Sequence, residues 1–398
     1  MPGPEFGVRP RGLCRGAALS LVLAGALATV SATGSWSYDD GADPAAAARP
    51  APARATVAAK ATEDAVARAA AEAVADGKSG KEAAEEAVSR SGDRWGAVYD
   101  PAEYREFEQS LDGEYTGVGL WAKQGADGRV DVARVQPGSP AARAGVRRGD
   151  RLRSVDGHRV EGRPVTEVVS LLRGDRAGRP ADRAGTQVAL GLGRGDREWT
   201  EKLRRATLAT EAVTVEDLPD GARLIKVASF TKGTGGRVRD AVRAAPRGKG
   251  ILLDLRGNPG GLVGEAVTAV SAFLDGGLVA TYDDRGRQRA LHAEPGGDTA
   301  RPVVALVDGG TMSAAELAVG ALQDRGRALT VGSRTFGKGS VQKPSTLADG
   351  SVAELTVGHY RTPAGHLLDG RGITPDLAVT QGAKERAQTV LSGLQGGS

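Results

Sequence analysis

The amino-acid sequence predicts a multi-domain chain of the α/β (α+β) class, in which a helical region and a small β domain precede an α/β core. Three patterns support this prediction. Residues 62–89 and 100–111 show helical periodicity, residues 114–208 alternate short apolar strands with glycine turns, and strands alternate with helices after Val213. The chain has 398 residues, enough for two or three domains with apolar cores.

We divide the chain into a signal peptide or uncleaved anchor (1–32), a disordered linker rich in Ala, Pro and Gly (33–59), an N-terminal helical region (60–113), the β domain (114–208), the α/β core (209–383) and a C-terminal tail (384–398).

The N-terminal segment has the pattern of a signal peptide. Arg9, Arg11 and Arg15 precede an uncharged run of small and apolar residues, 16–30. The run is short for a membrane span, but no charge follows it before Asp39, so an anchor stays open. Both alternatives predict an extracytoplasmic location.

Composition excludes several function classes. The net charge is only +4, and basic residues are mixed with acidic ones, so no nucleic-acid partner is predicted. Cys14 is the only cysteine and precedes the apolar run; removal of a signal peptide would leave no thiol for disulfides or catalysis. The four histidines lack metal-ligand spacing, and we predict no metal site. They are His158, His292, His359 and His366.

Two helical stretches are expected before the β domain. Residues 62–89 have helical periodicity with a break at 77–80. A further helix opens at Asp100-Pro101 and runs to Leu111, because proline is favoured at the first helical position.

The β domain carries the sequence Gly-Asp-Arg-Leu-Arg-Ser-Val-Asp-Gly at 149–157, and a short amphipathic helix at 166–172. With its pattern of short strands, it resembles a PDZ domain. The resemblance implies that a peptide adds to the sheet as an extra strand and that a backbone loop holds its C-terminal carboxylate. The loop residues would be Gly117, Val118, Gly119 and Leu120. An ordinary glycine turn before a strand has the same pattern. The charged stretch 176–183 looks inserted beside the peptide site.

After Val213 the alternation of elements predicts a sheet covered by helices. The expected strands are 223–230, 250–255, 278–282, 302–307 and 328–331, and the expected helices are 235–245, 262–274 and one that begins near Ser313.

Ser313 follows a short buried strand and a turn at Gly309-Gly310, and it opens a helix. Unpaired backbone N–H groups and the positive end of the helix dipole surround that position. Such donors suit a nucleophile, because attack on a carbonyl creates a negative oxygen. The alternative is structural, since Ser313 and Glu316 also have the spacing of a capping box.

Two further stretches contain groups that could take part in binding or catalysis. Residues 254–261, Asp-Leu-Arg-Gly-Asn-Pro-Gly-Gly, follow a buried strand and could present backbone N–H groups or form only a tight turn; no Walker lysine follows. In an extended segment, Lys338, Ser340 and Gln342 would face one side. A lysine between glycines is often a solvated turn residue. If it is buried, its pKa falls and the neutral amine can act as a general base, oriented by Gln342.

Taken together, these motifs resemble those of the carboxyl-terminal processing peptidases, also called tail-specific proteases. The resemblance runs from about residue 100 to residue 379 and includes motifs at 360–365 and 369–376. It implies a site without metal or cofactor, composed of Ser313 as nucleophile, Lys338 as general base, Gln342 as the orienting residue, and an oxyanion hole from the N–H groups of Gly260 and Ala314, with Gly261 as the alternative to Gly260.

We therefore predict a secreted or membrane-tethered serine endopeptidase that cleaves polypeptides near their free C-termini. It would use a Ser–Lys dyad rather than Ser–His–Asp, after the PDZ domain captures the substrate tail. A non-catalytic PDZ adaptor or chaperone is the alternative, and the PDZ-like domain disfavours a hydrolase of small esters. A membrane tether through the N-terminal apolar segment and a homodimer are left open.

Overall fold

The computed structural model describes residues 53–125, 127–174, 184–284 and 287–396. The predicted signal or anchor segment, 1–32, and the charged stretch 176–183 lie outside the described residues. No helix within the described ranges combines the length and the apolar content that crossing a bilayer requires. A helix begins at Ala53, inside the segment predicted as a disordered linker, so that prediction is wrong from Ala53 onward.

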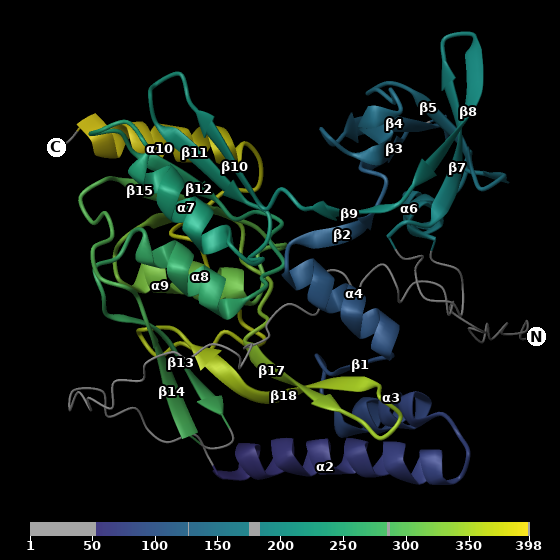
Figure 1. Ribbon diagram of the computed structural model, residues 1–398. Coiled ribbons are helices and arrows are strands. Elements are labelled where there is room, and N and C mark those ends of the chain that lie inside the picture. Colours follow the sequence, from purple (N-terminus) through teal and green to yellow (C-terminus); the bar gives the residue numbers. More distant parts are fainter. Residues whose placement is uncertain (1–52, 126, 175–183, 285–286, 397–398) are drawn as a thin grey trace, which may run out of the picture.

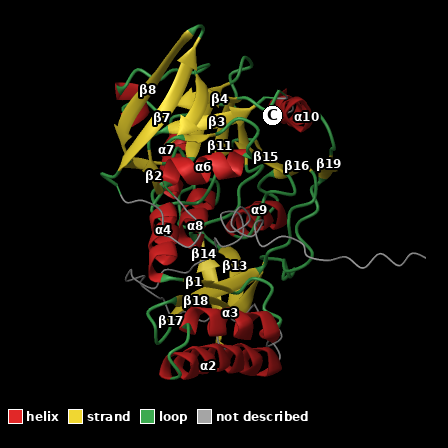
Figure 2. Cartoon of the chain, turned by 90° about the vertical axis from the view of Figure 1, so that its right-hand side faces the viewer, coloured by secondary structure: helices red, strands yellow, loops and turns green. Residues whose placement is uncertain are grey.

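The N-terminal helical region consists of α2 (Ala53–Ala75), α3 (Gly80–Ser91), the short strand β1 (Ala97–Tyr99) and α4 (Pro101–Leu111). Asp100 caps α4 and Pro101 occupies its first turn, as the sequence predicts. Figure 2 shows α2 and α3 stacked below β17 (Ser340–Thr346) and β18 (Val352–Arg361). One buried cluster joins these helices to β18 and to Leu347, which directly follows β17: Val66, Ala70, Ala84, Val88, Leu347, Ala353 and Leu355.

The β domain is a sheet in the order β3 (Leu120–Gln124), β4 (Val130–Val135), β5 (Arg151–Val155), β7 (Gln187–Arg194) and β8 (Arg197–Arg204), with β6 (His158–Arg159) beside β5. Its helices are α5 (Pro140–Arg143) and α6 (Val165–Arg173). Inward-facing valines and leucines of these elements form its own apolar core. In Figure 1 the domain stands apart from the rest and is joined to it through the antiparallel pair β2 (Glu114–Gly117) and β9 (Ala206–Ala209).

The α/β core is built on a sheet in the order β10 (Val213–Asp217), β11 (Arg223–Val227), β12 (Ile251–Asp254), β15 (Val303–Val307), β16 (Leu329–Gly332) and β19 (Leu377–Ala378). Only β10 runs antiparallel to its neighbour in this sheet. Helices α7 (Thr234–Arg243), α8 (Val263–Ser271) and α9 (Ala314–Asp324) share one apolar cluster with the sheet. Residues pointing to the opposite face pack on α10 (Ala383–Gly396).

Helix α10 corrects one expectation. Its Ala387 and Leu391 are fully buried against the sheet, so the segment predicted as a C-terminal tail belongs to the core. A second sheet, ordered β1, β18, β13 (Leu278–Asp284) and β14 (Arg287–His292), with β17 beside β18, was only partly predicted. Strand β14 escaped the sequence analysis because its exposed arginines and glutamine obscure the apolar alternation.

Sheet order explains where the chemically interesting loops meet. Strands β12, β15 and β16 are adjacent and parallel, so their carboxyl ends lie at one edge of the sheet. The glycine-rich turn follows β12, the serine loop follows β15 and the lysine loop follows β16. In parallel α/β sheets this edge is where ligand sites form.

Candidate active site

Ser313 lies directly before α9, at the end of the loop that follows β15. Its φ of 55° and ψ of −118° define a conformation that residues other than glycine rarely adopt. Within the described ranges, Asp156 is the only other non-glycine residue with positive φ. The Ser313 side chain is 1% exposed, and its Oγ has no hydrogen-bond partner among the described residues. Such strain in a strand-to-helix turn indicates a functional constraint on the serine.

Glu316 of α9 joins the serine helix to the lysine loop. Its Oε2 accepts hydrogen bonds from Ser313 N at 3.0 Å and from Lys338 N at 2.8 Å. Its Oε1 accepts from Gly337 N at 2.7 Å and from Thr335 Oγ1 at 2.5 Å. Burial raises the pKa of Glu316, and these four hydrogen bonds oppose the rise. One oxygen therefore holds the backbones of Ser313 and Lys338 side by side, a role the sequence analysis did not assign.

We expect Glu316→Ala to abolish peptide cleavage and to lower the free energy of unfolding by roughly 3 kcal/mol or more, because four buried donors lose their acceptor. Glu316→Gln should lose less stability, since it keeps the shape of the side chain. Urea unfolding followed by circular dichroism measures both variants. Glu385→Ala, on the exposed side of α10, serves as the control. A free energy of unfolding equal to that of wild type in Glu316→Ala would contradict this linking role.

Lys338 is buried, which is the condition under which the sequence analysis expected it to act as a general base. It lies in the loop before β17, and its side chain is 0% exposed. Burial lowers the pKa of Lys338 to about 8, while the negative charges of Glu354, Asp93 and Asp369 oppose that shift. The centroid of the Trp95 ring lies 5.3 Å from Lys338 Nζ. An amine with this pKa has a substantial neutral fraction near pH 8 and can accept a proton.

Glu354 of β18 is a second buried ionisable group near this lysine, and no motif pointed to it. Its two carboxyl oxygens have no hydrogen-bond partner in the described part of the chain. Burial raises the pKa of Glu354 to about 8, and the charge of Lys338 acts against this rise. Pairing of Pro344 with Glu354 and of Gln342 with Thr356 places Glu354 diagonally opposite Gln342 on one face of the strand pair.

Gln342 and Ser340 lie in β17 and are fully buried, but Lys338 lies in the loop before the strand. A bulge between Val341 and Gln342 interrupts the simple alternation that the sequence analysis assumed. The Nε2 of Gln342 donates to Trp95 O, and its Oε1 has no partner among the described residues. The structure thus holds Gln342 through the N-terminal region rather than through a hydrogen bond from Lys338 to Oε1.

The glycine-rich turn lies against the serine loop. Gly260 and Gly261 have φ values of 100° and 131°, which favour glycine. A Cβ atom on Gly260 would stand 2.9 Å from Met312 O, 3.0 Å from Ser313 Cβ and 3.1 Å from Ala314 N, so the three predicted oxyanion-hole residues do lie together. The N–H of Gly260, however, donates to Asn258 Oδ1 at 2.8 Å.

Asn258, Thr311 and Asp308 fasten the turn to the serine loop, and the sequence analysis gave none of them a role. The buried Asn258 also donates from Nδ2 to Val227 O at 3.0 Å and accepts from Met312 N at its own carbonyl oxygen at 2.9 Å. Thr311 Oγ1 donates to Leu255 O at 2.9 Å, and Asp308 Oδ1 accepts from Gly257 N at 2.9 Å. In the sequence, the only sign of these hydrogen bonds was that each of the three polar residues stands next to a glycine.

The predicted carboxylate loop connects β2 to β3, and α6 packs against both strands. The side chain of Val118 is buried in the domain core, and its carbonyl oxygen accepts from Ala141 N at 2.9 Å. Gly119 has a φ of 79°, and a Cβ atom there would stand 2.2 Å from Ser139 Cβ. Gly119 therefore has no room for a side chain, and the loop is closely fitted to the domain.

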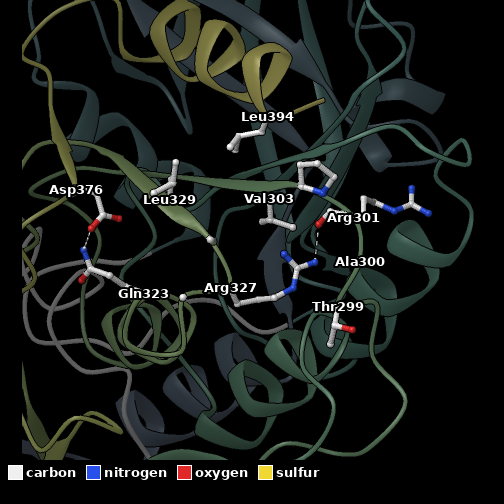
Figure 3. A pocket seen from close by; sticks show the side chains of 12 residues that line it. Thr299, Ala300, Arg301, Val303, Gln323, Arg327, Leu329, Asp376 and Leu394 are labelled. Carbon is white, nitrogen blue, oxygen red and sulfur yellow. Dashed lines mark hydrogen bonds between the residues drawn. The ribbon is translucent and has the colours of Figure 1, made fainter. Parts of the chain in front are cut away.

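A separate hollow lies at the opposite edge of the α/β sheet (Figure 3). It opens at the amino ends of β15 and β16, whereas the serine and lysine loops follow their carboxyl ends. Its Arg327 is already bonded to the carbonyl oxygens of Phe273, Asp298 and Arg301. In the described part of the chain, no cluster of histidine, cysteine and acidic residues could hold a metal ion.

Comparison with known proteins gives matches in both major domains. Residues 223–379 match the model of peptidase family S41, and residues 132–181 match that of the PDZ domain. The carboxy-terminal processing protease CtpA of Bacillus subtilis (strain 168) is 32% identical over 290 residues, which is 72% of this chain and 60% of that protein. A CtpA-like serine protease of Staphylococcus aureus (strain N315) is 31% identical over 309 residues, covering 76% of this chain and 60% of the relative.

The chain thus spans about 60% of the length of these curated relatives. Among solved structures, an S41 protease from Bacteroides fragilis NCTC 9343 has the same fold, with a TM-score of 0.51, 18% identity, and coverage of 76% of this chain and 87% of that one.

The fold and the matches define an α/β peptidase core with a PDZ domain inserted ahead of it. Residues 223–379 thus belong to peptidase family S41, and the chain as a whole is similar to carboxy-terminal processing proteases. The resemblance noted in the sequence and the multi-domain α/β fold are both confirmed.

Proposed function

We propose that the chain is a serine endopeptidase that works with a Ser–Lys dyad. The observation that carries the proposal is the shared carboxylate of Glu316, which bonds the backbone of the strained Ser313 and that of the buried Lys338. Lys338 has a pKa of about 8, so it supplies a neutral amine under mildly alkaline conditions. An adaptor that only binds tails needs neither the strain nor the buried amine.

The proposed reaction has two halves. Ser313 Oγ attacks the scissile carbonyl carbon while its proton passes to Lys338 Nζ; the C–N bond then breaks as the ammonium protonates the leaving amine. Water then attacks the acyl carbon and gives a proton to Lys338 Nζ; the ester C–O bond breaks, the ammonium returns that proton to Ser313 Oγ, and the product leaves with a new C-terminal carboxyl group. Ser313 Oγ makes no hydrogen bond to described residues in this state, and catalytic hydrogen bonds often form only when substrate binds.

Backbone N–H groups at the start of α9 supply the oxyanion hole in this mechanism. We assign Ala314 N, which lies in the first turn of the helix, as one donor. Gly261 is favoured as the second donor, because the N–H of Gly260 already bonds Asn258. Gly260 remains the alternative if substrate displaces that bond. Gln342 is proposed to orient Lys338 once the substrate has closed the site.

The PDZ domain is proposed to capture free C-terminal tails. An extended tail would pair with β3 beside α6, with its carboxylate held by the backbone of residues 117–120. The substrates would be unfolded polypeptides met outside the cytoplasm, as the signal-like segment predicts. A membrane tether through that segment and a homodimer remain further proposals.

We expect an unfolded polypeptide with an apolar free C-terminus to be cleaved at least several-fold faster than the same polypeptide with an amidated C-terminus. The reason is that amidation removes the carboxylate that the PDZ loop would bind. Mass spectrometry of the products, with Ser313→Ala as the control for contaminating proteases, measures both rates. Equal rates would contradict tail capture. Tight binding of the free tail without cleavage would favour the adaptor.

A further inference from the structure

The segment between α3 and β1 is fastened to the second sheet by Asp93. The carboxylate of Asp93 accepts hydrogen bonds from Trp95 N at 3.1 Å and Gly96 N at 3.0 Å, which fix the turn. It also accepts from the N and Oγ1 of Thr356 on β18, both at 2.8 Å. The partly buried carboxylate of Asp93 therefore ties the turn to the strand.

From this turn, Trp95 reaches three groups around the proposed base. Its ring centroid lies 5.3 Å from Lys338 Nζ, and its carbonyl oxygen accepts from Gln342 Nε2. Its indole Nε1 donates to Asp369 Oδ1 at 3.2 Å, and the same oxygen accepts from Gly339 N at 3.2 Å. One residue of the N-terminal helical region thus contacts the lysine and, through two hydrogen bonds, Gln342 of β17 and Asp369 in the loop after β18.

We propose that Trp95 is a positioning residue of the peptidase site, which closes the pocket of Lys338 and makes catalysis depend on docking of the N-terminal helical region. This inference rests on the proposed Ser–Lys mechanism. It gives that region a role beyond its packing: α2 and α3 hold the turn in place by their apolar contacts with β18 and with Leu347, which directly follows β17.

The Trp95 ring acts on the lysine in two opposite ways. Its face attracts an ammonium ion, which favours the charged form, and its bulk excludes water, which favours the neutral form. Burial is the largest cause of the fall in the pKa of Lys338 from 10.5 to about 8, so exclusion of water dominates. Removal of the ring should therefore raise the pKa of Lys338 and leave less neutral amine at neutral pH.

Other charged groups face this lysine from each element packed around it. They are Asp93 on the turn, Glu354 on β18 and Asp369 in the loop after β18. Arg94 lies over the Trp95 ring, and Glu316 of α9 accepts from the backbone N–H of Lys338. Trp95→Ala and Trp95→Phe both remove the indole hydrogen bond to Asp369 and leave the other charged groups in place, so a difference between their pH profiles reports on the aromatic ring.

The test is the pH dependence of kcat/KM between pH 6 and pH 10 for wild type, Trp95→Ala and Trp95→Phe. We expect Trp95→Ala to be about tenfold slower than wild type at pH 7 and within about twofold at pH 10, because a rise of one pKa unit removes tenfold of the neutral base. Trp95→Phe keeps an aromatic face and should keep the wild-type pH profile. Trp199→Ala, in β8 of the PDZ domain, controls for loss of a tryptophan elsewhere.

A Trp95→Ala profile that falls equally at every pH, or does not change, would overturn the inference, even if the enzyme is slower. If circular dichroism shows that Trp95→Ala is unfolded, Trp95→Val, which is much smaller than the indole and also admits water, replaces it with the same expectation and the same overturning result. Activity in Ser313→Ala would refute the proposed function itself. Loss of activity in Ser313→Ala together with an unshifted Trp95 profile would refute only the role of Trp95.

Discussion

Ser313→Ala is expected to lower kcat for peptide cleavage by roughly 10⁴-fold or more while the fold stays intact, because no other group can form the acyl-enzyme. The side chain is buried at the junction of β15 and α9, and its Oγ bonds no described residue, so its loss leaves no donor or acceptor unpaired there. Product analysis by mass spectrometry gives kcat, and circular dichroism confirms the fold. Cleavage within tenfold of wild type would rule out Ser313 as the nucleophile.

The strained backbone at Ser313 leads to a second prediction, which concerns the stability of variants at this position. At φ 55° and ψ −118°, a side chain is disfavoured but glycine is not. Ser313→Gly should therefore be inactive yet more stable than Ser313→Ala by about 1 kcal/mol, after the greater freedom of glycine in the unfolded chain is counted. Urea unfolding of the two variants measures the difference. A less stable glycine variant would show that the serine is not strained.

Lys338→Met should be as inactive as Ser313→Ala at every pH, because it removes the only proposed base. For wild type, the sign of the pH dependence follows from the lowered pKa: below about 8 the lysine is protonated and cannot accept a proton. We expect kcat/KM to rise about tenfold per pH unit up to that value and then to level off. Initial rates between pH 6 and pH 10 test this profile.

Lys343→Met is the matched control for that experiment. Lys343 lies on the same strand as Gln342 but pairs with Asp284 at 2.9 Å, and its neutralisation should leave the pH profile unchanged. A wild-type rate that rises at a pKa near 6.5 would point instead to a histidine. Substantial activity in Lys338→Met would contradict the dyad.

Much of the fold could be predicted from local patterns. The strands β12 and β15 are short apolar runs bounded by turn residues, and Asp100-Pro101 marks the start of α4. The proposed nucleophile and the proposed base could be predicted because each lies in a distinctive glycine-rich stretch. Their proximity could not be derived from spacing alone, because it depends on the order of β12, β15 and β16 in the sheet.

The residues that surround Lys338 could not be predicted from the sequence, because they come from distant parts of the chain. Trp95 and Gln342 are separated by 247 positions, and nothing local in either segment signals that one covers the other. Glu354 looks like an ordinary charged residue in a strand until the packing of β1 and β17 buries it. The predicted linker and tail failed similarly, since α2 and α10 draw their stability from surfaces formed elsewhere in the chain.

The most direct test of the Ser–Lys mechanism is to trap the acyl-enzyme. Wild type, Ser313→Ala and Lys338→Met would be mixed with an activated ester, quenched in acid after a short time, and mapped by peptide mass spectrometry. The mechanism predicts one acyl group, on Ser313 of the wild type, which is absent in Ser313→Ala and forms far more slowly in Lys338→Met. An acyl group on another residue, or equal labelling of Ser313 in the lysine variant, would contradict it.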